Sequence, residues 1–379
     1  MSKRLVTSES VTEGHPDKVA DQISDAVLDE CLRQDPMARV ALEALLTRGL
    51  VVVAGEVTVN GQIDFAGIAR RVVSGIGYTS TDVGMDGETC GVAVAVQKQS
   101  AHIAMGVDTG GAGDQGMMIG YACNETDQLM PLPIMIAHRM TKMLADVRKQ
   151  EPNLGLRPDG KTQVSVVYEG GTPKSIETVV VSTQHEPRLD QAAVRDLVMS
   201  RIVNPVLSEF SHKIDIVPKH IHVNPTGKFE IGGPQGDTGL TGRKIIVDTY
   251  GGICGHGGGA FSGKDATKVD RSAAYIARYI AKNIVAAGLA DRVETHLAYA
   301  IGVAQPVALN LETFGTHKVD PERLSAKILD AFDLSPKGII ERLDLRKPQF
   351  EPTAKNGHFG NPAFRWEQTD AAEIFRSLA

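Results

Sequence analysis

The 379-residue chain has little of what marks several classes of protein. Its four cysteines, Cys31, Cys90, Cys123 and Cys254, form no Cys-x-x-Cys pair, which excludes a zinc-finger or disulfide framework and predicts reduced, structural thiols. No apolar stretch approaches the roughly 18 residues that span a bilayer, and residues 1–4 lead into polar residues without the apolar segment of a signal peptide. We therefore expect a soluble, cytoplasmic protein with no membrane partner.

An excess of basic residues is also absent. The net charge is −6, and 23% of the residues are charged. Proteins that bind a nucleic-acid backbone neutralise its phosphates with clusters of lysine and arginine. No nucleic-acid partner is expected for this chain.

Glycine, by contrast, is abundant and unevenly placed. It supplies 39 residues, above the usual share of about 7%, and thirteen of the 39 lie between residues 224 and 265. Within that stretch, Gly258–Lys264 fits the pattern G-x-x-x-x-G-K, in which backbone amides and a lysine surround phosphate oxygens. Asp265 follows, where a P-loop has a serine or threonine for magnesium. A P-loop NTPase and a flexible glycine loop are the alternatives to a phosphate site of another fold.

Charged side chains of both signs accompany these glycines. Cations mixed with carboxylates suit a polyphosphate that carries a metal, although each residue alone is equally well a solvated turn residue. The set comprises Lys228, Asp237, Arg243, Lys244, Lys264, Asp265, Lys268 and Asp270.

A second concentration of candidate residues lies near the N-terminus. His15 and Asp17 stand at the start of a helix that is expected to begin at Pro16, where free N–H groups and the positive end of the helix dipole favour anions. His15 is suited to hydrogen-bond a phosphate oxygen and Asp17 to hold a metal, with ordinary helix capping as the alternative. Glu56 interrupts an apolar strand, so it needs either a charged partner, such as a ligand ammonium, or an edge position that faces water.

Two further patterns carry less information. His220 and His222 share one face of a strand, a spacing that can bind metal, but no third ligand is near them in the sequence. The residues Pro158–Lys161 are typical of a turn, and a ligand-binding loop is the less favoured interpretation.

Periodicity and turn signals predict a mixture of helices and hairpins. Apolar residues recur every four positions from Pro16 to about Arg33, which is typical of an amphipathic helix, and Asp270 is expected to cap a second helix that runs to about Ala287. We expect strands at 50–59, 62–65, 92–96, 163–168, 176–182 and 293–301, with hairpins across 60–61 and 169–172 and a mobile loop at 100–116. Because strands and helices do not alternate regularly, the predicted class is α+β with antiparallel sheets rather than a Rossmann fold.

Several longer strings complete the pattern. Gly-Ala-Gly-Asp-Gln-Gly stands at 111–116 and Gly-Gly-Gly-Ala-Phe-Ser-Gly-Lys-Asp at 257–265. Others are Glu-Gly-His-Pro-Asp-Lys at 13–18, Gly-Gly-Pro-Gln-Gly-Asp at 232–237, Thr-Gly-Arg-Lys at 241–244, Lys-Val-Asp-Arg-Ser-Ala at 268–273 and Gly-His-Phe-Gly at 357–360. Through these strings the chain resembles the S-adenosylmethionine synthetase (methionine adenosyltransferase) family over essentially its full length.

The resemblance implies a fold and an assembly. The fold is α+β, with three similar domains of antiparallel or mixed sheet that carry helices on one face, in a pseudo-threefold arrangement. The expected domains are residues 1–100 (N-terminal), 111–231 (central) and 232–379 (C-terminal), with structural domains that interleave segments and a mobile active-site loop at 100–113. The expected assembly is a homotetramer, a dimer of dimers with active sites at the dimer interface.

The resemblance also implies a reaction, in which an alkyl transferase joins ATP, L-methionine and water to give S-adenosylmethionine, phosphate and diphosphate. The methionine sulfur attacks C5′ of ATP, tripolyphosphate leaves whole, and it is then hydrolysed. A thioether needs no base, so catalysis consists of holding the sulfur in line and stabilising charge on the departing tripolyphosphate, which explains a site crowded with cations.

Matching positions imply the roles of individual residues. The implied catalytic residues are His15, Lys161, Arg243 and Lys264. The implied ATP-binding residues are these four with Asp159, Lys228, Phe229, Asp237, Lys244 and Ala260. The implied methionine-binding residues are Glu56, Gln99, Asp114, Asp237 and Lys268. Asp17 and Asp270 match ligands of two Mg²⁺ ions per site, and Glu43 matches the site of one K⁺ ion per subunit.

One of these residues departs from the family pattern, because Lys228 stands where the family has arginine and a bidentate fork is lost. Two other classes of function are kept as alternatives. A P-loop-like kinase or ATPase is disfavoured by Asp265, and a non-catalytic nucleotide-binding regulatory subunit is disfavoured by the intact His15 and Lys264.

Overall fold

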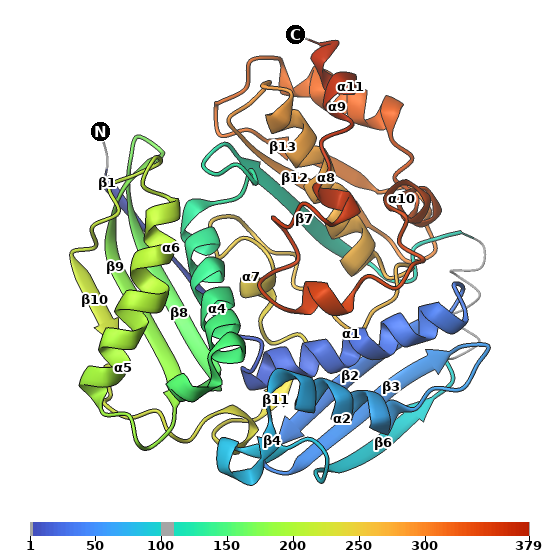
Figure 1. Cartoon of the computed structure of the whole chain (residues 1–379). Helices are drawn as coiled ribbons and strands as arrows, with labels where there is room; N and C mark the ends of the chain where they lie inside the picture. Colours follow the sequence, from blue (N-terminus) through green and yellow to red (C-terminus); the bar gives the residue numbers. More distant parts are fainter. Residues whose placement is uncertain (1–2, 100–109, 379) are drawn as a thin grey trace.

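The computed structural model describes residues 3–99 and 110–378, so most of the predicted loop at 100–113 lies outside the described residues. Figure 1 shows three lobes around a centre in which α7 (Ile245–Asp248) lies close to the start of α1 (Pro16–Gln34). Each lobe contains one of the three larger sheets with helices packed on it. The predicted α+β class is confirmed.

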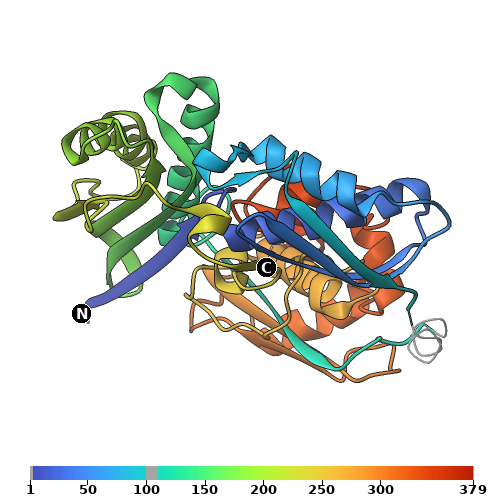
Figure 2. The same ribbon diagram turned by 90° about the horizontal axis from the view of Figure 1, so that it is seen from below.

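The first lobe contains a sheet with the strand order β1-β8-β9-β10. Its strands are β1 (Lys3–Val11), β8 (Leu156–Glu169), β9 (Thr172–His185) and β10 (His220–Val223). Its helices are α4 (Leu132–Gln150), α5 (Gln191–Val198) and α6 (Asn204–Glu209). The hairpin predicted across 169–172 is confirmed, and each of its two strands is 14 residues long. In Figure 2 this lobe stands apart on the left, and β1 leads from it toward the other two lobes.

The second lobe contains the strand order β11-β2-β3-β6. Its strands are β11 (Gly239–Leu240), β2 (Arg39–Thr47), β3 (Leu50–Thr58) and β6 (Gly91–Gln97), and α1 and α2 (Phe65–Ile76) are its helices. The hairpin predicted across 60–61 is wrong, because α2 begins where its second strand was expected. The Asp64 side chain accepts a hydrogen bond from the Gly67 N–H at 2.8 Å and caps this helix. The helix prevails because it buries Val72 and Val73 in the core.

The third lobe contains the strand order β13-β12-β7. Its strands are β13 (Ala308–Glu312), β12 (Arg292–Tyr299) and β7 (Gly116–Cys123). Its helices are α8 (Val269–Ala286), α9 (Pro321–Ala331), α10 (Pro336–Leu343) and α11 (Ala372–Arg376). The predicted cap of α8 is wrong, since Lys268 is the N-cap and Asp270 lies inside the first turn, where it pairs with Lys264.

Shorter elements lie between these strands and helices. They are the ribbon of β4 (Thr79–Ser80) and β5 (Met85–Asp86), the 3₁₀ turns Thr81–Val83, Pro152–Leu154, Gly233–Gln235, Glu351–Ala354 and Arg365–Glu367, and the π-helical turn Met199–Val203.

Each larger sheet takes a strand from a distant part of the chain. β1 pairs with β8, β11 pairs with β2, and β7 pairs with β12. The segments 1–100, 111–231 and 232–379 therefore each give one strand to a neighbouring sheet. This exchange brings residues 239–265 against the N-terminal helix.

α1 is buried on nearly all sides. The predicted helix is confirmed in its bounds, and its apolar side chains lie in the core. Its polar side chains are covered as well, because Asp21 and Asp25 are both 0% exposed. The amphipathic pattern predicted that these polar side chains face water, but they face loops of the protein instead.

Buried ion pairs hold α8 in place. Arg278 forms two hydrogen bonds with the carboxylate of Glu367, both at 2.9 Å, and Lys282 Nζ lies 2.6 Å from the same carboxylate. Both Arg278 and Glu367 have fully buried side chains. Neither cation has access to enough water to replace this partner.

We predict that Glu367→Ala lowers the free energy of unfolding by about 3–5 kcal/mol, because two cations lose the carboxylate that they share in a buried site. Urea denaturation followed by circular dichroism measures this. Lys337→Ala, which removes an exposed partner of Glu341 on α10, is the control and should leave the midpoint unchanged. Equal shifts in the two variants would contradict the assignment.

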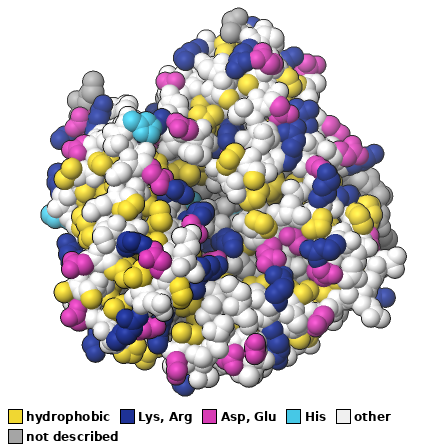
Figure 3. All heavy atoms as spheres, in the orientation of Figure 1, with side chains coloured by type: hydrophobic (Ala, Val, Ile, Leu, Met, Phe, Trp, Pro, Cys, Tyr) yellow, Lys and Arg dark blue, Asp and Glu magenta, His cyan; other side chains and the backbone are white. Residues whose placement is uncertain are grey.

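The surface is hollowed where the first and third lobes meet, and lysine and arginine side chains gather around this hollow (Figure 3). Its volume is about 510 Å³, and it is lined by residues of α4 and of 352–362, including Arg139, Lys142 and Lys355. None of the residues predicted for the functional site lines it. The described helices include none that is long and apolar enough to cross a membrane.

Candidate active site

His15 lies at the N-cap of α1 with an imidazole that is only 2% exposed. Its Nδ1 accepts a hydrogen bond from the Asp17 N–H at 3.2 Å, which fixes the ring at the helix start. Burial, together with the nearby charges of Lys244 and Lys161, lowers the pKa of His15 to about 3. The imidazole is therefore neutral near pH 7 and able to donate a hydrogen bond from its other nitrogen.

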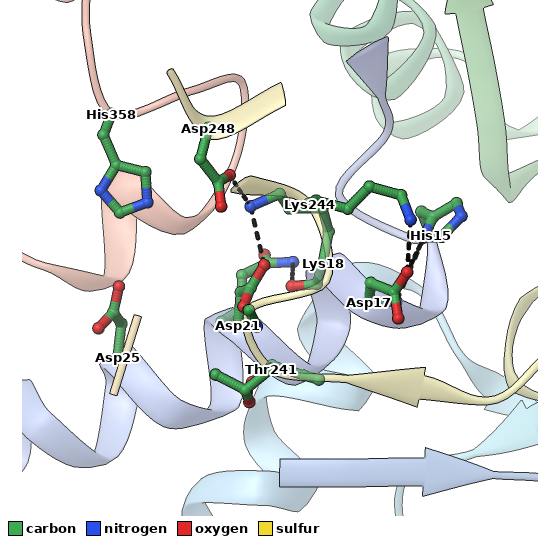
Figure 4. A network of polar contacts seen from close by, with 12 residues as sticks. His15, Asp17, Lys18, Asp21, Asp25, Thr241, Lys244, Asp248 and His358 are labelled. Atoms are coloured by element: carbon green, nitrogen blue, oxygen red, sulfur yellow. Dashed lines mark hydrogen bonds and ion pairs between the residues drawn. The ribbon is translucent and has the colours of Figure 1, made fainter. Parts of the chain in front are cut away.

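Asp17, on the first turn of α1, is the carboxylate on which this group of residues converges. Its Oδ2 lies 2.5 Å from Lys244 Nζ, and its Oδ1 accepts a hydrogen bond from the Leu240 N–H at 3.0 Å. Arg243 Nη1 is 3.7 Å from the same Oδ1. Burial raises the pKa of Asp17, but the hydrogen bonds from Lys244 and from the Leu240 N–H together with the nearby positive charge of Lys244 outweigh it, so the net pKa is lowered and the group stays ionised. Figure 4 shows His15, Asp17 and Lys244 pointing toward one another.

Asp159 and Lys161 extend this site along β8. Asp159 is 6% exposed, and its Oδ2 accepts a hydrogen bond from the Gly233 N–H at 2.8 Å. Its Oδ1 has no hydrogen-bond partner among the described residues, and burial raises the pKa of the carboxyl to about 6. Lys161 has an exposed side chain and is close enough to lower the pKa of His15. Asp159 thus offers a free acceptor beside a cluster of cations.

The remaining residues predicted to bind ATP are placed unequally. The Phe229 ring lies against Gly232, whose added Cβ would also meet the Asp159 carboxylate, so Phe229 and Asp159 share one wall. Asp237 is exposed and close enough to raise the pKa of Asp159. Lys228 has a side chain that is 83% exposed and pairs with Glu230 at 3.3 Å. The structure does not bring Lys228 to the cations around Asp17.

A second set of predicted residues lines a hollow of about 330 Å³ between β2, β3 and the loop that carries Lys264. Glu43, Glu56 and Ala260 contribute to its wall. Lys264 Nζ pairs with Asp270 Oδ2 at 2.6 Å. Glu56 is half-buried and faces the open space of the hollow, which leaves its carboxylate available to a ligand.

Three further residues predicted for the methionine site are absent from the lining of this hollow. Lys268 pairs with Asp265 on the turn that leads into α8. Gln99 follows β6, whose Gln97 is the register partner of Glu56, so it lies near the same strand end. Asp114 is exposed and lies shortly before β7, close to residue 110, where the described part of the chain resumes.

The predicted residues therefore form two groups. The helix-start group comprises His15, Asp17, Asp159, Lys161, Arg243 and Lys244. The hollow group comprises Glu43, Glu56, Ala260, Lys264 and Asp270. The two meet where a Cβ added to Gly242 would lie 2.6 Å from the Ala260 Cβ.

Magnesium is bound by oxygen ligands, and the described residues contain no group of three or more His, Cys, Asp or Glu side chains that could hold an ion. Asp17 and Asp270 nevertheless fit magnesium, because this ion is commonly held by one or two carboxylates together with substrate phosphates. A lysine ammonium already stands against each of these carboxylates. Glu43 is a single exposed carboxylate on β2, compatible with a weakly held monovalent cation.

A buried polar network behind Asp17 is absent from the sequence predictions. Lys18 Nζ donates a hydrogen bond to Asp21 Oδ2 at 2.8 Å and also pairs with Asp248 (Figure 4). Burial raises the pKa of Asp248 to about 7 even though Lys18 opposes it. The recurrence of aspartate every four residues along the predicted helix was the signal available in the sequence.

The P-loop alternative is not supported by the geometry. Residues 258–264 lie outside the strands and helices, Lys264 forms an isolated bridge with Ala41, and α8 begins only at Val269. A P-loop requires a strand that leads directly into the loop and a helix that follows it.

Comparisons with known proteins agree with the fold. The family models described as the N-terminal, central and C-terminal domains of S-adenosylmethionine synthetase match residues 3–101, 109–229 and 231–368. An "S-adenosylmethionine synthase" of Desulforudis audaxviator (strain MP104C) is 53% identical over 395 aligned positions, which cover 100% of this chain and 99% of that protein. The chain belongs to the S-adenosylmethionine synthetase family, and the predicted resemblance is confirmed.

Because Lys244 and Lys228 were predicted for the same ligand but are placed differently, they form a matched pair. We predict that Lys244→Met lowers kcat about 100-fold, the typical cost of one preorganised donor to developing charge, whereas Lys228→Met lowers it less than about threefold because this side chain is exposed. Steady-state kinetics with purified variants measures both. A larger loss for Lys228→Met would contradict the placement.

Proposed function

We propose that this chain is a cytoplasmic methionine adenosyltransferase that converts ATP, L-methionine and water to S-adenosylmethionine, phosphate and diphosphate. One observation carries the proposal: Lys161, Arg243 and Lys244 converge on a neutral His15 and an ionised Asp17 at the start of a buried helix. This arrangement suits a small polyanion that arrives with a metal. It coexists with a net charge of −6, so the cations are concentrated locally.

The chemistry of the first step needs position and charge rather than a base. Methionine sulfur attacks C5′ of ATP, the C5′–O bond breaks, and its electron pair leaves with the tripolyphosphate. His15, neutral and fixed at the helix start, donates a hydrogen bond to the departing oxygen. Lys161, Arg243, Lys244 and Lys264 stabilise the charge that develops on the triphosphate. The same cations hold tripolyphosphate while water cleaves it.

Nucleoside and methionine are held by the flanking residues. The free Oδ1 of Asp159, the Phe229 ring, Asp237 and Ala260 contact the nucleotide, and exposed Lys228 adds charge at its edge. Glu56 binds the methionine ammonium within the hollow, with Gln99, Asp114, Asp237 and Lys268 around the amino acid. A carboxylate without a charged partner among the described residues is well suited to pair with an ammonium.

Two Mg²⁺ ions per site are proposed on Asp17 and Asp270, and one K⁺ per subunit near Glu43. Bound magnesium supplies charge neutralisation of the phosphate oxygens. Asp17 is held ionised and oriented by the Leu240 N–H, so it presents a fixed ligand.

An assembly is proposed from the open faces of the sheets. Val94 on β6, Met117 on β7 and Val307 beside β13 are 47%, 48% and 60% exposed, so two of the larger sheets present large apolar side chains at their surfaces. We propose that a second copy covers these faces, that each active site combines the helix-start group of one copy with the hollow group of its partner, and that two such dimers form a homotetramer.

The direct test is incubation of the purified chain with ATP, methionine, magnesium and potassium. We expect S-adenosylmethionine, phosphate and diphosphate in equal amounts, measured by liquid chromatography and phosphate assays. ADP as the nucleotide product would favour a kinase. Tight nucleotide binding without any product would favour a regulatory subunit.

His15→Ala separates the two chemical steps. We predict a loss of at least about 100-fold in S-adenosylmethionine formation, the lower range for removing a positioned proton donor. Hydrolysis of added tripolyphosphate should fall much less, because His15 contacts the oxygen that leaves C5′. Single-turnover measurements of both steps test this, and equal losses would refute the role.

A further inference from the structure

Four aspartates recur every four residues along α1 and form a ridge, which we call the acidic ridge: Asp17, Asp21, Asp25 and Asp29. All four are at most 5% exposed. Each accepts hydrogen bonds from backbone N–H groups of distant loops: Leu240 at 3.0 Å, Gly242 at 2.9 Å, Gly263 at 2.9 Å, and Gln349, Phe350 and Glu351 at 2.8–3.0 Å.

Two members of the ridge hold glycines that directly precede cations of the site. Asp21 holds Gly242, which is followed by Arg243 and Lys244. Asp25 holds Gly263, which is followed by Lys264. Both glycines have left-handed backbones, with φ of +81° and +79°, and each follows a hydroxyl residue, Thr241 or Ser262. The same arrangement, an aspartate of α1 bound to a left-handed glycine that precedes a cation, therefore occurs twice, one helical turn apart.

The first of these loops is fixed at both ends. Asp21 accepts from Gly242 N–H and from Lys18 Nζ, and Lys18 also pairs with Asp248 at the end of α7 (Figure 4). The chain between Gly242 and Asp248 contains Arg243 and Lys244. Its backbone closes on itself through a hydrogen bond from Asp248 N–H to the Lys244 carbonyl at 2.8 Å.

Asp21 itself lies outside the reacting groups. Its carboxylate is 0% exposed, and both oxygens are used within the protein. The cations that it anchors reach Asp17 one turn earlier on the same helix, at 2.5 Å for Lys244 and 3.7 Å for Arg243. Because this buried carboxylate holds the loop backbone at Gly242, it sets the direction in which the side chains of Arg243 and Lys244 point.

The geometry points to Asp21 as a positioning residue of the reaction: through Gly242 and the Lys18–Asp248 pair, it aims Lys244 and Arg243 at the triphosphate site beside Asp17 and His15. This inference rests on the proposed function. Because the effect runs through the two cations, a change at Asp21 alters turnover without altering contacts to methionine.

The test uses Asp21→Asn in the full-length protein. Asparagine has almost the same shape, but its single carbonyl oxygen cannot serve both Gly242 N–H and Lys18. We expect kcat for S-adenosylmethionine formation to fall about tenfold or more, because displacements on the order of 1 Å at such a site are that costly. The KM for methionine should stay within about twofold of the wild-type value.

A double-variant comparison separates positioning from general damage. The effects of coupled residues are not additive. If Asp21 acts through the cations of its loop, adding Asp21→Asn to the Lys244→Ala variant should therefore lower kcat by only about threefold or less. Asp29→Asn is the matched control, because Asp29 is a buried ridge member that holds residues 349–351 and no cation loop. Its effect on kcat should be small, and it should add fully to that of Lys244→Ala.

Thermal melting and circular dichroism of each variant establish folding. If Asp21→Asn does not fold, Asp248→Asn takes its place, because it loosens the other end of the loop and leaves the Lys18–Asp21 pair intact. The same non-additivity with Lys244→Ala is expected.

Three results would be decisive against the inference. Full additivity of Asp21→Asn with Lys244→Ala, an effect no larger than that of Asp29→Asn, or a loss confined to the KM for methionine would each overturn it. Failure of the proposed function is distinguishable, because the wild-type protein would then form no S-adenosylmethionine, or Lys244→Ala alone would leave its formation unchanged.

Discussion

Burial of α1 together with its four aspartates is the constraint on which the site depends. A buried carboxylate is tolerated only when hydrogen-bond donors or cations surround it. Here the donors are backbone N–H groups of residues 240–263 and 349–351. The cations are Lys244 on Asp17, Lys18 on Asp21 and Arg271, which donates two hydrogen bonds to the carboxylate of Asp25. The loops must therefore lie against the helix, and Arg243, Lys244 and Lys264 follow directly from that placement.

Two of the clustered glycines have the same cause. Gly242 and Gly263 adopt left-handed backbones that turn their N–H groups toward the helix, and a Cβ on Gly263 would lie 1.9 Å from the Leu42 carbonyl oxygen. Only glycine meets both conditions. At these two positions glycine is therefore required by the backbone conformation and by close packing.

Much of the fold could be predicted from local patterns: the helix from Pro16, the hairpin across 169–172 and the strand before 301 depend on neighbours in sequence. The hairpin expected after Asn60 failed because a capped helix from Phe65 competes for the same residues. Asp270 failed as a cap because its carboxylate is taken by Lys264. The role of Asp21 could not be predicted, because Gly242, its hydrogen-bond partner, and Asp248, which shares Lys18 with it, both lie more than 200 residues away in the sequence. Strand exchange between the lobes brings them to the helix.

The sequence predicted which residues form the candidate site better than it predicted how they are arranged. The strings around His15, Lys244 and Lys264 identified the residues, but their division into two groups, and the separation of Lys228 from both, required the structure. The most direct measurement is a crystal structure of the protein with methionine, magnesium and an imido analogue of ATP. We expect the triphosphate between Lys244 of one copy and Lys264 of the second copy, with Gly242 still bound to Asp21. A triphosphate bound elsewhere, or an Asp21 carboxylate detached from Gly242 in that complex, would contradict this expectation.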